Sequence, residues 1–309
     1  MVIDKKEYPS KDVAPIEQLG SNSGEAFKEQ FITCLLDLVS KNSIKNSINK
    51  ITSYHTRHTK SSLINEVATW LLSELRSFGY TDLYFDKYAE GGYSLKNVIC
   101  HKHGLMNKIV IICAHYDSIT EDINNAEDPA PGADDNASGV AALLEIARVL
   151  SKIQLQESIE FVFFSGEEQG QWGSKHYARH IQENKVDLHW LINLDMVGSP
   201  PSNQKRVIIE RDMGNKVSNN DRDSQVFGEY MKQIAAKYTD LQAAFGHIYD
   251  SDYMPFEALG YVVTGLYDEG QINTTYHSKN DLVSTLNVDY IVSVTKLALA
   301  TILNRCYKN

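Results

Sequence analysis

Acidic side chains and a histidine follow three short apolar runs of this sequence. Each run reads as a buried strand, and each is followed within three residues by His, Asp or Glu. The three pairs are 109–114 with His115 and Asp117, 159–164 with Glu167 and Glu168, and 190–194 with Asp195. Open α/β sheets bind ligands outside the carboxyl ends of their strands. We therefore expect these side chains to meet at one edge of a sheet.

A fourth segment, 131–139, adds Asp134 and Asp135 in a glycine-containing loop. Converging carboxylates repel one another and raise one another's pKa unless a cation neutralises them. His, Asp and Glu together form the ligand set of zinc, and of manganese or cobalt in similar sites. The residue types therefore predict a metal centre.

Two of these pairs suggest a division of roles. His115 and Asp117 are two residues apart, so on a strand they share a face and Asp117 could orient a ligating His115. Glu167 and Glu168 are adjacent, and in an extended backbone they point in opposite directions. One of the two could bind metal while the other faces the substrate as a base.

Each fragment has a simpler interpretation when it is taken alone. A His-x-Asp sequence is common in surface turns, and adjacent glutamates usually form a solvated acidic patch. Asp134 and Asp135 could serve as a turn and a helix N-cap. The order of the fragments and their shared placement after apolar runs favour a functional site.

The elements that must position these residues alternate between helix and strand. Apolar residues at helical spacing predict helices, and short runs without polar alternation predict strands that are covered on both faces. We expect one α/β domain over 24–309, with a central mixed, mainly parallel sheet flanked by helices, after a polar extension over 1–23. The predicted helices are 24–40, 61–78, 141–150, 174–182 and 287–306, and the predicted strands are 83–85, 97–100, 109–114, 159–164, 190–194 and 261–263.

Composition narrows the range of partners. The 309 residues carry a formal net charge of −10, which disfavours a nucleic-acid partner. No apolar run approaches the ~20 residues that a membrane span needs. Residues 1–23 have no apolar core like that of a signal peptide. The cysteines are widely spaced, which favours free thiols over a disulfide framework or a zinc–thiolate site; they are Cys34, Cys100, Cys113 and Cys306.

Taken together, the motifs resemble the di-zinc aminopeptidases, metallopeptidase family 28, typified by secreted bacterial leucyl aminopeptidases. The likeness covers nearly the whole chain from about residue 45 and implies a zinc-exopeptidase fold. The segments that carry it, in order, are His115–Ser118, Pro131–Gly139, Gly166–Tyr177, Leu194–Met196 and Tyr276–Ser278.

The resemblance implies a role for each matching position. Asp135 would bridge two zinc ions, and Asp134 would have no metal role. The remaining implied ligands are His115 and Asp195 for one zinc ion, and Glu168 and His277 for the other. The other implied roles are general base for Glu167, orientation of His115 for Asp117, and contact with the developing oxyanion for Tyr276.

The implied reaction is hydrolysis of the N-terminal peptide bond of peptides that have a free N-terminus. The resemblance also implies a secreted or periplasmic location, although no signal peptide is visible in the sequence, and a monomer is our default expectation. Apolar residues could line a pocket for the first side chain, but ordinary core packing explains them equally well; they are Met254, Phe256 and Ile272.

Two alternatives stay open. A glutaminyl cyclase has a similar fold and keeps much of the ligand set, but it uses a single zinc to cyclise N-terminal glutamine. Receptor-like relatives keep the fold as binding modules and lose ligands, whereas all five ligand positions and the base are filled here. One departure from the family is the loop 249–253, which carries a disulfide in some secreted relatives and has no cysteine in this chain.

Overall fold

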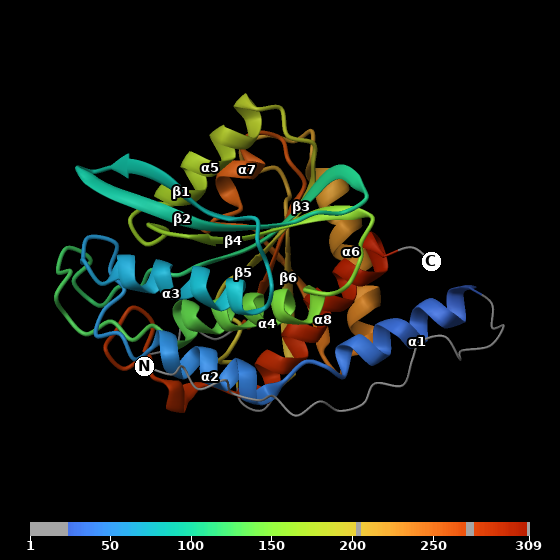
Figure 1. The fold of residues 1–309 in the computed structure, drawn as a ribbon, viewed down its shortest axis with the longest axis horizontal. Helices are drawn as coiled ribbons and strands as arrows, with labels where there is room; N and C mark the ends of the chain where they lie inside the picture. Colours follow the sequence, from blue (N-terminus) through green and yellow to red (C-terminus); the bar gives the residue numbers. More distant parts are fainter. Residues whose placement is uncertain (1–23, 202–204, 270–274, 308–309) are drawn as a thin grey trace.

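A single eight-stranded sheet forms the centre of the protein (Figure 1). The computed structural model describes residues 24–201, 205–269 and 275–307. The strand order is β1-β2-β4-β3-β5-β8-β6-β7. The strands are β1 (Leu83–Glu90), β2 (Tyr93–Lys102), β3 (Met106–His115), β4 (Glu157–Phe164), β5 (Leu188–Leu194), β6 (Arg206–Arg211), β7 (Gln242–His247) and β8 (Val263–Tyr267).

Helices cover both faces of this sheet (Figure 1). A larger core cluster lies on one face, under α1, α2, α3, α4, α6 and α8, and a smaller cluster lies on the other face, under α5 and α7. The helices are α1 (Gly24–Leu36), α2 (Lys41–Ile51), α3 (Ile64–Ser77), α4 (Gly139–Leu150), α5 (Trp172–Glu183), α6 (Asp221–Tyr238), α7 (Met254–Glu257) and α8 (Val288–Cys306).

The central strands are mostly apolar because both of their faces are covered. On β3, Val110 and Ile112 belong to the larger cluster, whereas Ile111 and Cys113 belong to the smaller one. Four of the seven neighbouring strand pairs are parallel. The predicted mixed, mainly parallel sheet flanked by helices is therefore confirmed.

The register of the central strands brings their carboxyl ends to one level. β3 runs parallel to both β4 and β5. His115 pairs with Phe164, the last residue of β4. Cys113 pairs with Asn193, so Asp195 leaves β5 beside His115. The acidic residues that follow β4 and β5 therefore emerge next to the histidine that ends β3.

Some elements differ from the sequence prediction. The first helix ends at Leu36 rather than at 40, and the strand predicted at 261–263 lies at Val263–Tyr267. The sequence prediction did not include α2 and α6, although both bury apolar residues at helical spacing, such as Ile44, Ile48 and Ile51 of α2. The pair β6 and β7 was not predicted either, because β7 lies at the sheet edge and its side chains are only partly buried.

The cysteine prediction is confirmed within the described residues, where all four thiols are free. Cys34 is exposed, and the other three are buried. Every helix that the structure describes is too short or too polar to cross a bilayer. The predicted extension over 1–23 lies outside the described residues, and the domain boundary at residue 24 stays a prediction.

The structure describes two of the three residues that could line a substrate pocket, and both belong to or pack against the core. Phe256 is fully buried in the smaller core cluster, where its ring centroid lies 6.2 Å from that of Phe164. Met254 packs against the same cluster. Ile272 lies outside the described residues. Of the two interpretations left open for Phe256, core packing is therefore the correct one, because its ring turns inward into the smaller cluster.

Replacing Phe256 by alanine should lower the free energy of unfolding by about 3–5 kcal/mol, because it leaves a cavity in the core. Relative activity on different substrates should stay unchanged, since the ring does not reach the substrate. Urea unfolding and a substrate panel measure the two effects. Leu105→Ala is the control, because Leu105 is 67% exposed and its loss should change stability by less than about 0.5 kcal/mol.

Candidate metal centre and active site

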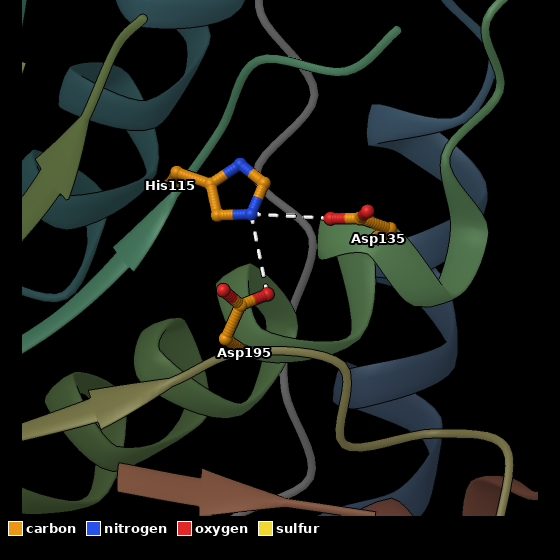
Figure 2. Close-up of side chains that lie close together, drawn as sticks. All are labelled: His115, Asp135 and Asp195. Atoms are coloured by element: carbon orange, nitrogen blue, oxygen red, sulfur yellow. Dashed lines mark hydrogen bonds and ion pairs between the residues drawn. The ribbon is translucent and has the colours of Figure 1, made fainter. Parts of the chain in front are cut away.

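His115 ends β3 with its imidazole between two carboxylates (Figure 2). Its Nε2 lies 3.1 Å from Oδ1 of Asp135 and 3.2 Å from Oδ1 of Asp195. His115 is almost completely buried, and Asp195 is partly exposed. The potential ligand atoms of all three residues lie within 4.8 Å of one another, which is close enough to hold one metal ion.

A second group of three residues shares Asp135 with the first. Nε2 of His277 lies 3.2 Å from Oδ2 of Asp135 and 2.9 Å from Oε2 of Glu168. Within the described residues, neither this nitrogen nor Oε1 of Glu168 has a hydrogen-bond partner. The three side chains thus aim their ligand atoms at a common point, as metal ligands do.

Asp135 belongs to both groups through different oxygens. Its Oδ1 lies beside His115 and its Oδ2 beside His277. The carboxylate is 6% exposed, and it follows Gly132, whose φ of 47° turns the chain into the loop. A carboxylate placed in this way can bridge two ions. The structure therefore brings together all five residues that the sequence suggested as ligands.

The pKa shifts of the residues in the two groups favour positive charge at the site. Burial alone would lower the pKa of His277, but Asp135 and Glu168 raise it to about 10. The pKa of His115 is likewise raised well above its usual value, chiefly by Asp195 acting against burial. Burial and the nearby Asp135 raise the pKa of Glu168 to about 8. These shifts mean that the site attracts cations, and its nitrogen and carboxylate donors fit zinc.

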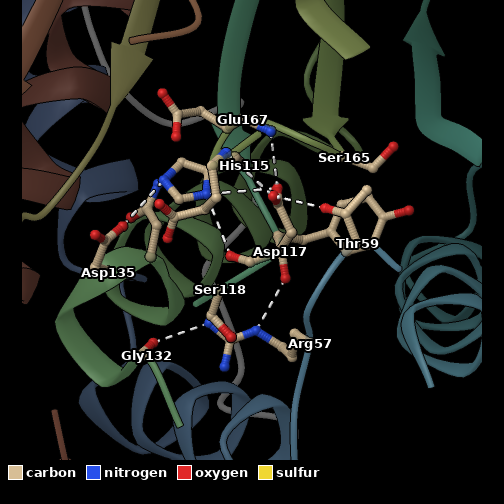
Figure 3. A network of polar contacts seen from close by, with 12 residues as sticks. Arg57, Thr59, His115, Asp117, Ser118, Gly132, Asp135, Ser165 and Glu167 are labelled. Atoms are coloured by element: carbon tan, nitrogen blue, oxygen red, sulfur yellow. Dashed lines mark hydrogen bonds and ion pairs between the residues drawn. The ribbon is translucent and has the colours of Figure 1, made fainter. Parts of the chain in front are cut away.

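Glu167 lies at the side of the two groups, and the Asp117 carboxylate holds its backbone (Figure 3). Asp117 accepts hydrogen bonds from the N–H groups of Glu167 and Glu168, each at 3.2 Å, and from the Thr59 hydroxyl at 2.9 Å. Burial raises the pKa of Glu167 well above its usual value, and the neighbouring carboxylates add to the rise. A carboxylate of raised pKa, partly open to the adjoining cavities, suits a general base.

Asp117 also contacts His115, but mainly through its backbone. Nδ1 of His115 lies 3.3 Å from the carbonyl oxygen of Asp117 and 3.7 Å from its carboxylate. The shorter contact fixes which ring nitrogen faces the metal groups. The carboxylate is fully buried, and its hydrogen bonds go to the turn that carries the two glutamates.

The loop that carries Asp135 is anchored by Asp281. The carboxylate of Asp281 accepts hydrogen bonds from the backbone N–H of Asp134 at 3.0 Å and from that of Asp135 at 3.0 Å. Asp134 is itself buried, and its Oδ1 accepts a hydrogen bond from Gly198 N–H at 2.9 Å. Asp134 belongs to neither metal group in the described part of the chain, as the resemblance implied.

Arg57 supports the same loop from a distant part of the sequence (Figure 3). This fully buried guanidinium donates to the carbonyl oxygens of Tyr116 and Gly132, each at 2.9 Å, and to that of Pro131. It thus links the end of β3 to the start of the Asp135 loop. Burial lowers the pKa of Arg57 to about 10, which still leaves it charged at neutral pH.

The Asp195 side of the site is held by the loop that follows β7. Ser251 donates a hydrogen bond of 2.5 Å to Oδ2 of Asp195, and Asn193 donates one of 2.8 Å to the Ser251 hydroxyl. The next residue, Asp252, is fully buried, and burial raises its pKa to about 7. These contacts leave Oδ1 of Asp195 directed towards His115.

Two cavities open beside the site. A larger one of about 590 Å³ borders Glu167, Glu168 and His277. A smaller one of about 80 Å³ borders His115, Asp195 and Glu167. Tyr276 lines both cavities, and its ring stacks on that of His277 with centroids 3.6 Å apart. Tyr276 is 41% exposed.

Several supporting residues were not identified from the sequence. Arg57 and Thr59 lie in a polar stretch between two helices, where no spacing marks them. Asp281 follows His277 by four residues, and this proximity was the only available signal. Ser251 and Asp252 lie in a loop that was noted only for its lack of cysteine.

A model of peptidase family M28 matches residues 97–302, which is more than half of the sequence. The matched stretch contains both metal groups. The chain belongs to peptidase family M28. The sequence resemblance to metallopeptidase family 28 is thus confirmed.

Two relatives illustrate how the identity and the covered share of the chain vary. A probable zinc metalloprotease of Pyrenophora tritici-repentis is 33% identical over 188 residues, which cover 54% of this chain and 39% of that protein. Leucine aminopeptidase 1 of Neurospora crassa is 27% identical over 285 residues, which cover 86% of this chain and 68% of that protein. The match to the Pyrenophora protein therefore spans about two fifths of its length.

Solved structures show the same fold. The LapA aminopeptidase of Legionella pneumophila superposes with a TM-score of 0.79 at 22% identity, covering 95% of this chain and 79% of that one. A glutaminyl cyclase of Bacteroides thetaiotaomicron superposes with a TM-score of 0.73 at 20% identity, covering 86% and 98%. The zinc-exopeptidase type of fold is thus confirmed, and it is shared by both kinds of enzyme.

Replacing Asp281 by alanine should weaken metal binding by about 10–100-fold, because the loop of Asp135 loses its anchor. Asp281→Asn keeps one oxygen acceptor and should lose less. Competition with a chromogenic chelator measures the affinity. Asp289→Ala is the matched control, because Asp289 is an exposed aspartate in a surface ion pair with Lys41. Equal affinities for Asp281→Ala and the control would contradict the anchoring role.

Proposed function

We propose that this protein is a zinc-dependent aminopeptidase that releases the N-terminal residue of peptides, with two zinc ions bridged by Asp135. The observation that carries the proposal is the pair of three-residue groups that share Asp135 through separate oxygens. Membership of peptidase family M28 and the named aminopeptidase among its relatives support it.

In this proposal His115 and Asp195 complete one zinc site, and Glu168 and His277 complete the other. Zinc, when bound, acidifies water and polarises the scissile carbonyl. The Glu167 carboxylate accepts a proton from the attacking water and delivers it to the leaving amine. Asp117 holds Glu167 in place through its backbone N–H. In the same proposal the hydroxyl of Tyr276, which borders both cavities, donates to the oxyanion of the tetrahedral intermediate.

The acidic surroundings of the site also suit the free amino group of the substrate. Asp195, Glu167 and Asp250 all border the smaller cavity. An α-ammonium group would be attracted to these carboxylates, whereas a blocked N-terminus would bring no charge. This difference favours cleavage at the chain end over cleavage inside a peptide.

A glutaminyl cyclase is the second candidate, because such an enzyme shares the fold. It would need one zinc ion, whereas both groups of ligands are complete here. An inert binding module would have no reason to hold Glu167 beside two such groups. Both observations favour the peptidase. A secreted or periplasmic location and a monomeric state are proposed from the resemblance alone.

A panel of aminoacyl p-nitroanilides tests the activity. Unblocked substrates should be hydrolysed, N-acetylated ones should not, and chelation should abolish a rate that zinc restores. Hydrolysis of the acetylated substrates would contradict the exopeptidase proposal. Ammonia release from a glutaminyl peptide, with no anilide cleaved, would assign the protein to the cyclases instead.

Two variants separate metal binding from proton transfer. Glu167→Gln should keep both zinc ions and lose about 10²–10⁴-fold in kcat, because the base is missing. Asp135→Ala should lose both metal and activity. Zinc analysis of the dialysed proteins, together with steady-state kinetics, measures these effects. A zinc content of Asp135→Ala equal to that of the unaltered protein would exclude the bridging role.

A further inference from the structure

A buried glutamate, Glu210, lines the smaller cavity beside the proposed zinc site. It lies near the end of β6 and is 5% exposed. Its neighbours on the cavity wall include Asp195, Tyr253 and Tyr267. The mechanism proposed above gives Glu210 no role, so its presence in this wall requires another explanation.

The sheet leaves space around Glu210. In the two neighbouring strands, the residues paired with it are both glycines, Gly246 on β7 and Gly265 on β8. A Cβ atom on Gly265 would collide with Oε2 of Glu210 and with the ring of Tyr253. A Cβ atom on Gly246 would press on Ile208, which lies on the same face of β6 as Glu210. The carboxylate therefore occupies room that side chains would otherwise fill.

Glu210 has no cationic partner among the described residues. Oε2 of Glu210 accepts a hydrogen bond of 3.0 Å from the Tyr253 hydroxyl. Burying a carboxylate without a cation is costly. Burial accordingly raises the pKa of Glu210 to about 8, and Asp195 adds to the rise. A positively charged group entering the cavity would remove this cost.

The volumes of the two cavities favour different parts of a peptide in each. The cavity of about 590 Å³ is large enough for several residues, whereas that of about 80 Å³ is small. An aminopeptidase has one residue before the scissile bond and the whole peptide after it. If the first residue lies in the small cavity and the rest of the peptide lies in the large one, the first side chain faces Glu210.

We propose that Glu210 determines substrate specificity and selects peptides whose first residue has a cationic side chain, lysine or arginine. The inference rests on the proposed aminopeptidase activity. The wall supports it, because it also contains Asp195 and Asp250 but no lysine or arginine among the described residues. The wall also contains three tyrosines, and an aliphatic stem can pack against such amphipathic side chains; they are Tyr249, Tyr253 and Tyr267.

The test compares lysine and norleucine p-nitroanilides, since norleucine has the same aliphatic stem without the ammonium group. The unaltered protein should hydrolyse the lysine substrate with a kcat/KM at least about tenfold higher, as expected for a charge-assisted contact. In Glu210→Gln this preference should fall by about 10–100-fold through loss on lysine, while norleucine changes less than about threefold. Norleucine activity thus also shows that the variant is folded.

Glu229→Gln is the matched control, because Glu229 is an exposed glutamate that pairs with Arg211 at the surface. It should leave both substrates unchanged. Equal rates on lysine and norleucine in the unaltered protein would overturn the inference and leave the aminopeptidase proposal standing. A preference for leucine or glutamine would overturn it in the same way. Failure to hydrolyse any unblocked anilide would overturn both proposals together.

Discussion

Repulsion between buried carboxylates is the constraint on which this structure depends. Asp135, Glu168 and Asp195 lie close together at the edge of the sheet, and Glu167 stands beside them. Like charges at such distances cannot all stay ionised in a poorly solvated place unless cations are present. The same carboxylates raise the pKa of His115 and His277, which favours protonated histidines between them. A metal centre is the more complete response, and the surrounding fold holds the carboxylates in position for it.

The fold meets the constraint by using carboxylates in two different ways. Asp117 and Asp281 lie next to the site but direct their oxygens at backbone N–H groups. They fix the turns that carry the ligands and have their own charge stabilised by the same hydrogen bonds. Arg57 adds a positive charge beneath the loop without reaching the metal groups.

The sequence predicted the parts of the molecule in which a local pattern of residue types marks both an element and its place in the fold. The apolar runs of β3, β4 and β5 revealed both the strands and the edge where His115 and Asp195 meet. The supporting residues could not be found in this way. Arg57 approaches the site only after the chain has folded back over it, so no local pattern marks its role. The place of Phe256 stayed open in the sequence, since an apolar residue in a loop has the same appearance whether it faces core or substrate.

The β6–β7 pair shows how weak local signals can hide an important element. β6 is short and follows a polar segment, and its partner β7 is only partly buried. The apolar run 207–209 was not recognised as a strand, so Glu210 was not placed in the sheet. Its pairing with two glycines from distant segments became visible only in the folded chain. The metal ligands could be predicted because they lie at the ends of strands that the sequence marks. The cavity wall could not, because it depends on the order of the strands in the sheet.

The buried arginine beneath the Asp135 loop also bears on what counts as the smallest working unit of this protein. Arg57 and Thr59 lie well before residue 97, where the match to the family model starts. A fragment cut at that boundary would contain every proposed ligand and both glutamates. It would nevertheless lack the guanidinium that joins β3 to the loop and the hydroxyl that contacts Asp117. The functional module is therefore longer than its most recognisable stretch of sequence, and it includes the segment between α2 and α3.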